Sequence, residues 1–256
     1  RSLIDAGLDV LWVSIDGVRP ESYGDIRLGA ELPVVLENLW RFSRMRSLAH
    51  HMVPEIGIAF VAMKRNIADL PELLDLARRM RAQFFHVSNV LPHTEEMSRE
   101  ILYERALSNV TYYPSKWHRR LMIPKMDLNE FTREPFLKAL DSSYNVTLAG
   151  NNMGSSNDVC TFIENGATVV GWQGDLSPCP PLLHTHVGYL HGYERVSHRH
   201  IIGNIRDRDL LDMWLDPEYM EYRERVHRFA FAPCSFCGGC EMSRDNETDC
   251  FDNPAP

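Results

Sequence analysis

The sequence predicts an α/β protein in which a parallel sheet flanked by helices is followed by a small cysteine-rich domain. Two observations support this. Apolar strand-like and helix-like segments alternate through the first half, as they do in right-handed βαβ units. In addition, all six cysteines of the 256-residue chain follow residue 159. We therefore expect one domain over residues 1–150 and a second over residues 151–256.

Three short apolar segments of the first half are typical of buried parallel strands. They are rich in β-branched and aromatic residues and show little alternation, as expected where both faces of a sheet are covered. Between the first two, residues 31–48 carry apolar side chains at helical spacing. Another helix is expected after Asp69, the predicted N-cap, with Pro71 in its first turn. The three strands are residues 8–15 (LDVLWVSI), 55–63 (EIGIAFVAM) and 83–90 (QFFHVSNV).

Weaker patterns fill the rest of the first domain. Residues 98–107 and 129–140 are predicted helices, and residues 144–148 a strand leading out of the domain. Residues 111–127 mix basic and aromatic side chains and receive no assignment.

A ligand of a parallel sheet binds where the strands end at their carboxyl side, in an open sheet and in a barrel alike. In this chain those ends are residues 14–17, 63–66 and 88–92. An ordinary strand-to-loop turn is the alternative interpretation of Ser14, Asp16 and Gly17, because these residue types favour turns. Asn66 is expected to cap or brace the helix that follows it.

The second half begins with a predicted hairpin. Asn165-Gly166 is a strong two-residue hairpin signal between the β-prone residues 161–163 and 168–170. Cys160 and Cys179 lie near the two ends of this region. A histidine-bearing loop over residues 183–200 and a helix over residues 209–229 then lead to the last cysteines.

Four cysteines crowd into PCSFCGGCEMSRDNETDC, residues 233–250. Overlapping C-x-x-C steps in a chain without a secretory signal favour a metal over disulfides. Iron–sulfur clusters take thiolate ligands, usually four, but a tetrahedral zinc site can use the same residues. The residues alone leave both open. The candidate ligands are Cys160, Cys179, Cys234, Cys237, Cys240 and Cys250.

Composition restricts the classes of partner. The net charge is −8 and the charges of both signs are interspersed, which argues against a nucleic-acid surface. No run of ~18 apolar residues predicts a membrane span, and no signal peptide precedes the first strand. We expect a cytoplasmic protein. Because the sequence opens at Arg1-Ser2 in a helix-like segment and stops at Pro256, we also expect that both ends are cut from a longer protein.

Taken in order, the segments resemble a radical SAM domain followed by a SPASM auxiliary-cluster domain. The first-half segments are similar to the middle strands of a radical SAM barrel, and the second half resembles SPASM in its paired early cysteines, its GNI (203–205) and DMW (212–214) motifs, the region of Arg223 and the terminal cysteine block. The CSFCGGC…DNETDCFDNP ending is most similar to maturases of tungsten-cofactor oxidoreductases. The matching first-half segments are residues 5–8 (DAGL), 13–17 (VSIDG), 26–30 (IRLGA), 60–74 (FVAMKRNIADLPELL) and 87–92 (VSNVLP).

This resemblance implies a partial (β/α) radical SAM barrel and a SPASM-like domain. It implies one or more [4Fe–4S] auxiliary clusters on the six cysteines, and S-adenosylmethionine in the full-length protein. Ser14 and Asp16 would contact S-adenosylmethionine, and Arg27 would pair with its carboxylate. The implied partners are a peptide, protein or cofactor substrate and an electron donor such as ferredoxin or flavodoxin.

One departure from the family is a missing motif. Radical SAM enzymes hold their radical-generating cluster in a C-x-x-x-C-x-x-C loop, and no cysteine precedes Cys160 in this chain. We therefore expect the parent protein to be a radical SAM maturase and this fragment, by itself, to be inactive. The alternative function is a non-catalytic binding module stabilised by zinc or by one cluster.

Overall fold

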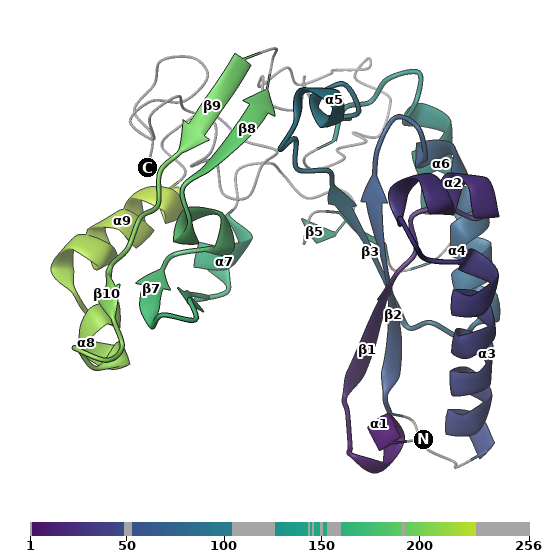
Figure 1. Cartoon of the computed structure of the whole chain (residues 1–256), viewed down its shortest axis with the longest axis horizontal. Coiled ribbons are helices and arrows are strands. Elements are labelled where there is room, and N and C mark those ends of the chain that lie inside the picture. Colours follow the sequence, from purple (N-terminus) through teal and green to yellow (C-terminus); the bar gives the residue numbers. More distant parts are fainter. Residues whose placement is uncertain are drawn as a thin grey trace, which may run out of the picture. The chain divides into compact units, whose positions relative to one another are not determined.

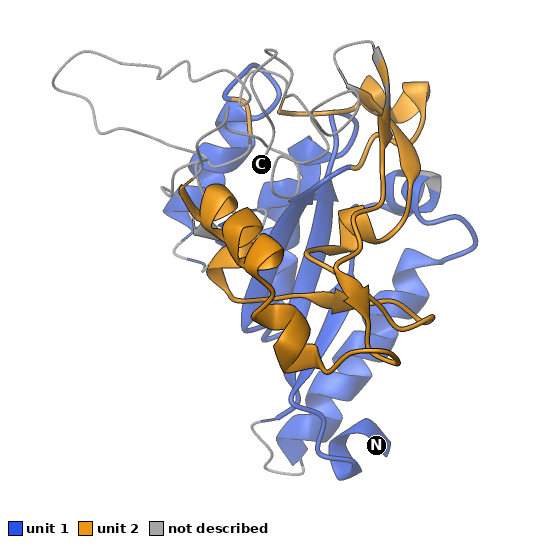
Figure 2. Cartoon of the chain, turned by 90° about the vertical axis from the view of Figure 1, so that its left-hand side faces the viewer, with its two compact units in different colours: residues 1–90, 128–153 blue, residues 91–127, 154–256 orange. Residues whose placement is uncertain are grey.

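The chain forms two compact units, which Figure 2 colours separately. The computed structural model describes residues 2–48, 53–103, 126–142, 144, 146–148, 151–152, 160–190 and 193–228. Unit 1 comprises residues 1–90 and 128–153, and unit 2 comprises residues 91–127 and 154–256. The domain boundary predicted at residue 150 stays a prediction. In the division into compact units, residues 91–127 belong to unit 2.

Unit 1 is built on a five-stranded sheet whose strands lie in sequence order. The first four strands are parallel, and the last is antiparallel to its neighbour. The predicted α/β class with a parallel sheet is confirmed. The strands are β1 (Val10–Ser14), β2 (Glu55–Ala62), β3 (Phe84–Asn89), β4 (Val146–Leu148) and β5 (Asn151–Asn152).

Helices cover one face of this sheet. In Figure 1, α3, α4 and α6 lie along the same side of β1–β3. Ile56, Ile58 and Phe60 alternate along β2 and are fully buried, as expected for the strand face that packs on helices. The helices of unit 1 are α1 (Ser2–Asp5), α2 (Pro20–Ile26), α3 (Leu32–Leu48), α4 (Leu70–Arg79) and α6 (Arg133–Asp141), with a short 3-10 helix at Ile67–Asp69.

The opposite face of the sheet carries Trp12, which is 50% exposed. Its ring stacks on Phe84 at a centroid distance of 6.0 Å. Gly57 makes room for the indole, because a Cβ atom at that position would lie 2.4 Å from a ring carbon of Trp12. The absence of a side chain on β2 therefore lets an aromatic residue of β1 lie against the neighbouring strand.

Unit 2 consists of short helices and small antiparallel sheets. One sheet has the order β10-β7-β6, and β8 pairs with β9 in a separate hairpin. The strands are β6 (Val169–Val170), β7 (Asp175–Ser177), β8 (His186–Leu190), β9 (Tyr193–Ser197) and β10 (Gly203–Asn204). The helices are α5 (Glu95–Ser98), α7 (Thr161–Glu164), α8 (Leu210–Trp214) and α9 (Pro217–Arg228), with a 3-10 helix at Pro180–Leu183.

The hairpin predicted around Asn165-Gly166 is wrong. Residues 161–164 form the helical turn α7, and Gly166, at φ +61°, follows its end. A left-handed glycine terminates a helix as readily as it closes a hairpin, so the dipeptide alone does not separate the two. The hairpin of this region instead joins β6 to β7 and contains Gly174 at φ +91°.

Three other predicted elements differ from the structure. Helix α5 ends at Ser98, so residues 99–103 of the helix predicted over residues 98–107 are not helical, and residues 104–107 lie outside the described residues. The helix predicted over residues 209–229 is divided into α8 and α9, because Pro217 cannot continue a helix but suits a first turn. The histidine-bearing loop over residues 183–200 contains the β8–β9 hairpin.

Candidate functional site

Asp16 follows β1 and links three segments of unit 1. Its carboxylate is fully buried. Oδ1 accepts a hydrogen bond from the Val61 main-chain nitrogen at 2.7 Å, and Oδ2 accepts one from Arg27 Nε at 2.5 Å. The carboxylate therefore connects the end of β1 with β2 and with the residue that follows α2.

Asn66 joins the same strand ends through its amide side chain. Its Nδ2 donates to the carbonyl oxygens of Asp16 at 3.0 Å and Val61 at 2.8 Å, and its Oδ1 accepts from the Met63 nitrogen at 2.8 Å. The side chain caps no helix. The predicted capping of the following helix by this side chain is therefore wrong, because the nearby strand carbonyls take both amide hydrogens.

The loop after β1 is held from a second side by Asp69. Asp69 occupies the predicted N-cap position of α4, but its side chain does not cap that helix. Its Oδ2 instead accepts from the Val18 nitrogen at 3.2 Å and from Ser22 Oγ at 2.8 Å. Gly17 is required in this loop, since a Cβ atom there would lie 2.6 Å from Ser22 Oγ and 2.8 Å from the Tyr23 nitrogen.

The three predicted cofactor-binding residues have different environments. Both oxygens of Asp16 are engaged within the protein. The Arg27 side chain is 36% exposed, and in the described part of the chain its Nη atoms have no acceptor. Ser14 is exposed and lies two residues from Trp12, on the same face of β1. The structure thus brings Asp16 and Arg27 together and leaves Ser14 and the Arg27 fork accessible.

A cavity of about 430 Å³ opens on the sheet face that carries Trp12. His86 lies in it, with Nδ1 2.9 Å from Thr147 Oγ1 and its ring edge-on to Trp12. Burial lowers the pKa of His86, which favours the neutral imidazole. Sequence reasoning missed this site, although Phe84 and His86 occupy alternate positions of a predicted strand.

The early cysteines of unit 2 are both buried and not in disulfides. Cys160 immediately precedes α7, and Cys179 precedes the 3-10 helix. Cys179 packs on Leu182, with Phe162 and Tyr222 against them. Cys234, Cys237, Cys240 and Cys250 lie outside the described residues. Within the described ranges, no three His, Cys, Asp or Glu side chains are grouped for a metal.

Aromatic residues on and before α9 pack around an arginine. The Arg223 guanidinium carbon lies 3.7 Å from the ring centre of Trp214 and 4.6 Å from that of Tyr219. Its Nη2 also donates to the Trp214 carbonyl oxygen at 2.6 Å. Such cation–π contacts are each worth about 0.5–2 kcal/mol, so Arg223 fixes these two rings relative to each other.

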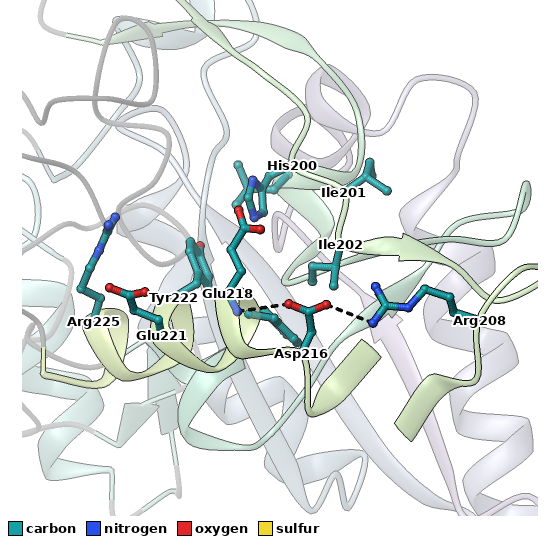
Figure 3. A pocket seen from close by; sticks show the side chains of 11 residues that line it. His200, Ile201, Ile202, Arg208, Asp216, Glu218, Glu221, Tyr222 and Arg225 are labelled. Atoms are coloured by element: carbon teal, nitrogen blue, oxygen red, sulfur yellow. Dashed lines mark hydrogen bonds and ion pairs between the residues drawn. The ribbon is translucent and has the colours of Figure 1, made fainter. Parts of the chain in front are cut away.

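Beside these rings, unit 2 contains a polar cavity of about 420 Å³, shown in Figure 3. His200 stacks on Tyr222 with ring centres 5.3 Å apart. Arg208 pairs with Asp216 at 3.0 Å. Burial lowers the pKa of His200, and the charge of Glu218 partly opposes that change.

Comparison with known protein families identifies a domain within unit 2. Residues 160–241 match SPASM, an iron–sulfur cluster-binding domain. This part of the chain is a SPASM domain. The matched range begins at Cys160 and contains every candidate ligand except Cys250. The expected auxiliary iron–sulfur domain is thereby confirmed, and Cys160 and Cys179 are its two buried thiols in the described residues.

Similarity to known proteins extends beyond the SPASM domain. The chain is 26% identical over 257 aligned residues to the tungsten-containing aldehyde ferredoxin oxidoreductase cofactor-modifying protein of Pyrococcus furiosus, covering 99% of this chain and 66% of that protein. The chain therefore spans slightly less than two thirds of this relative. The predicted resemblance to radical SAM proteins with a SPASM domain is confirmed.

Solved structures support the fold. Streptococcus suis SuiB bound to S-adenosylmethionine matches with a TM-score of 0.50 at 14% identity, covering 94% of this chain and 52% of SuiB. SuiB in a second crystal structure matches with a TM-score of 0.51 at 15% identity, covering 94% and 53%. In the described part of the chain, no helix has the length and apolar character needed to cross a membrane.

Proposed function

We propose that this chain is the substrate-facing and auxiliary-cluster part of a radical SAM maturase, which uses a 5′-deoxyadenosyl radical to modify a peptide, protein or cofactor. The observation that carries the proposal is the pair of buried, unbridged thiols, Cys160 and Cys179, in a SPASM domain that accompanies a parallel α/β unit. The similarity over 99% of the chain to a cofactor-modifying protein favours a cofactor among these substrates.

The cysteines suit an iron–sulfur cluster. Thiolates are the ligands of such clusters, usually four to each, and burial of Cys160 and Cys179 would keep water from the sulfurs. We assign all six cysteines, Cys160, Cys179, Cys234, Cys237, Cys240 and Cys250, as ligands of one or more [4Fe–4S] auxiliary clusters. When bound, such a cluster supplies a one-electron redox centre.

At the strand ends of unit 1, we assign Arg27 and Ser14 as contacts of S-adenosylmethionine in the full-length protein. Arg27 is suited to a ligand carboxylate because Asp16 fixes its Nε, while its Nη atoms have no acceptor among the described residues. Asp16 then acts by orienting Arg27 rather than by touching the ligand, because both of its oxygens are already used.

We assign no radical-generating cluster to this chain. No C-x-x-x-C-x-x-C motif occurs in the chain, and its first cysteine is Cys160. Incubated alone with S-adenosylmethionine and a reductant, the chain should release no 5′-deoxyadenosine. Release of that product would contradict this assignment.

The proposal includes a cytoplasmic location and an electron donor such as ferredoxin or flavodoxin. Reduced thiols persist in a reducing compartment, and neither Cys160 nor Cys179 is in a disulfide. A small electron-carrier protein would supply the electrons that clusters require.

Anaerobic purification followed by iron, sulfide and zinc analysis tests the proposal. We expect a brown protein with iron and sulfide in equal amounts. Cys160→Ser and Cys179→Ser should each lose most of both. Leu182→Val is the matched control, because it alters packing against Cys179 without removing a thiolate, and it should retain them. Zinc without sulfide would instead establish the metal-stabilised binding module.

A further inference from the structure

Tyr219 on α9 has a buried hydroxyl group that no residue in the described part of the chain engages. The residue is 2% exposed, and among the described residues its hydroxyl oxygen has no hydrogen-bond partner. A buried hydroxyl without a partner costs about 1–3 kcal/mol, whereas phenylalanine would fill the same space at no such cost. An unsatisfied polar group of this kind in a native core points to a partner other than the described residues.

The neighbours of the Tyr219 hydroxyl indicate where that partner lies. Burial raises the pKa of Tyr219; the Thr168 side chain and the Arg223 guanidinium oppose the rise, whereas the thiols of Cys179 and Cys160 add to it. Both buried cysteines therefore act electrostatically on the hydroxyl. Thr168 lies near the hydroxyl, but its Oγ1 is outside hydrogen-bonding geometry with Tyr219 and donates to the Ser177 carbonyl oxygen at 2.8 Å.

Packing places the tyrosine ring against the same cysteine region. Tyr222, one turn further along α9, packs on Cys179 and Leu182, and it stacks on Tyr219 with ring centres 6.3 Å apart. Helix α7, which begins after Cys160, contacts α9. Trp214 and Arg223 also contact the Tyr219 ring. The ring is thus fixed by several neighbours, one of which packs on Cys179.

We propose that the Tyr219 hydroxyl donates a hydrogen bond to a cluster-bound sulfur of Cys160 or Cys179 and thereby raises the reduction potential of the auxiliary cluster. This inference rests on the proposed function, because it requires these two cysteines to bind an iron–sulfur cluster. A thiolate bound to iron keeps lone pairs that accept hydrogen bonds. A donor there stabilises the more negative, reduced cluster, so hydrogen bonds to the sulfurs set the potential.

The test is Tyr219→Phe in the cluster-loaded chain, with the potential measured by an EPR-monitored redox titration. Iron and sulfide contents should equal those of the wild type. The midpoint should move to a more negative potential, with an about three- to tenfold smaller ratio of reduced to oxidised cluster at a fixed applied potential. Tyr189→Phe removes another hydroxyl of the same unit, one bonded to Glu194 on the surface, and should leave the midpoint unchanged.

Two further measurements separate this inference from its alternatives. Thr168→Val should not reproduce the shift; an equal shift would make Thr168 the partner of Tyr219 and overturn the inference. In the cluster-free chain, Tyr219→Phe should unfold at an equal or higher temperature, since it removes an unpaired group, and a lower temperature would also overturn it. If the purified wild-type chain contained no iron and sulfide, the proposed function itself would be refuted. If Tyr219→Phe carried the full cluster content and its midpoint potential were unchanged, only the role of Tyr219 would be refuted.

Discussion

Arg27 donates from Nε to Oδ2 of Asp16 across 2.5 Å, and the carboxylate that accepts this bond is completely buried. The other carboxylate oxygen accepts from the main chain of β2. A charge can be buried in this way only because both of its oxygens are satisfied. The pair therefore fixes the loop after β1 against the sheet while the outer part of the guanidinium remains available.

Asp16→Asn should destabilise unit 1 by about 2 kcal/mol, because an amide keeps the shape of the carboxylate but loses the charge-assisted bond to Arg27. Urea unfolding followed by circular dichroism measures the loss. Asp75→Asn is the control: Asp75 pairs with Arg78 on the surface, where its side chain is 67% exposed. That change should cost about 0–0.5 kcal/mol. Equal losses of unfolding free energy in the two variants would show that the buried Asp16–Arg27 pair stabilises the protein no more than a surface pair does.

Asn66→Ala should cost about 3 kcal/mol, since it leaves one main-chain N–H and two carbonyl groups at the strand ends without their partner. The Met63 amide should exchange its hydrogen with solvent faster than in the wild type. Asn38→Ala, which removes an exposed bond to Arg41 on α3, should change neither stability nor exchange. Unaltered exchange at Met63 in Asn66→Ala would contradict the assigned bond.

Gly17→Ala should destabilise the loop after β1 by about 2 kcal/mol, because the new methyl group would collide with main-chain atoms of Ser22 and Tyr23. Gly24→Ala is a matched control in the neighbouring helix α2. A Cβ atom at Gly24 meets open space, and alanine should stabilise the helix by about 0.5–1 kcal/mol. Thermal unfolding of the two variants should therefore shift in opposite directions, and shifts of the same sign would rule out the steric explanation.

His86 should make the stability of unit 1 depend on pH. Burial lowers its pKa below the ordinary 6.5, so the unfolded chain binds a proton more readily than the folded one. Its contribution is complete above the unfolded pKa and is lost as the pH falls from there toward the folded pKa. Wild-type stability should accordingly fall more steeply between about pH 7 and pH 5 than that of His86→Gln. Parallel pH profiles in urea unfolding would show that the imidazole is not desolvated.

Sequence patterns predicted the parallel sheet well because its strands are short segments rich in apolar residues and its helices have a single apolar face. They failed where one local signal serves two structures. Asn165-Gly166 fits a hairpin and a helix end equally well, and Asp69 has the chemistry of a helix cap but bonds to a loop distant in sequence. Spacing marked the cysteines as candidate metal ligands, whereas it did not single out Tyr219, because an unpaired hydroxyl becomes visible only when its surroundings are known.

Gly57 cannot be replaced by a larger residue without moving the aromatic ring beside it. The indole of Trp12 occupies the space above this residue, so even one added methyl group would force the ring away from β2. The displaced ring would move at the rim of the cavity that holds His86, and the cavity would change shape without any alteration of its polar groups. A single position without a side chain thus fixes the place of the Trp12 ring and, with it, the shape of this cavity.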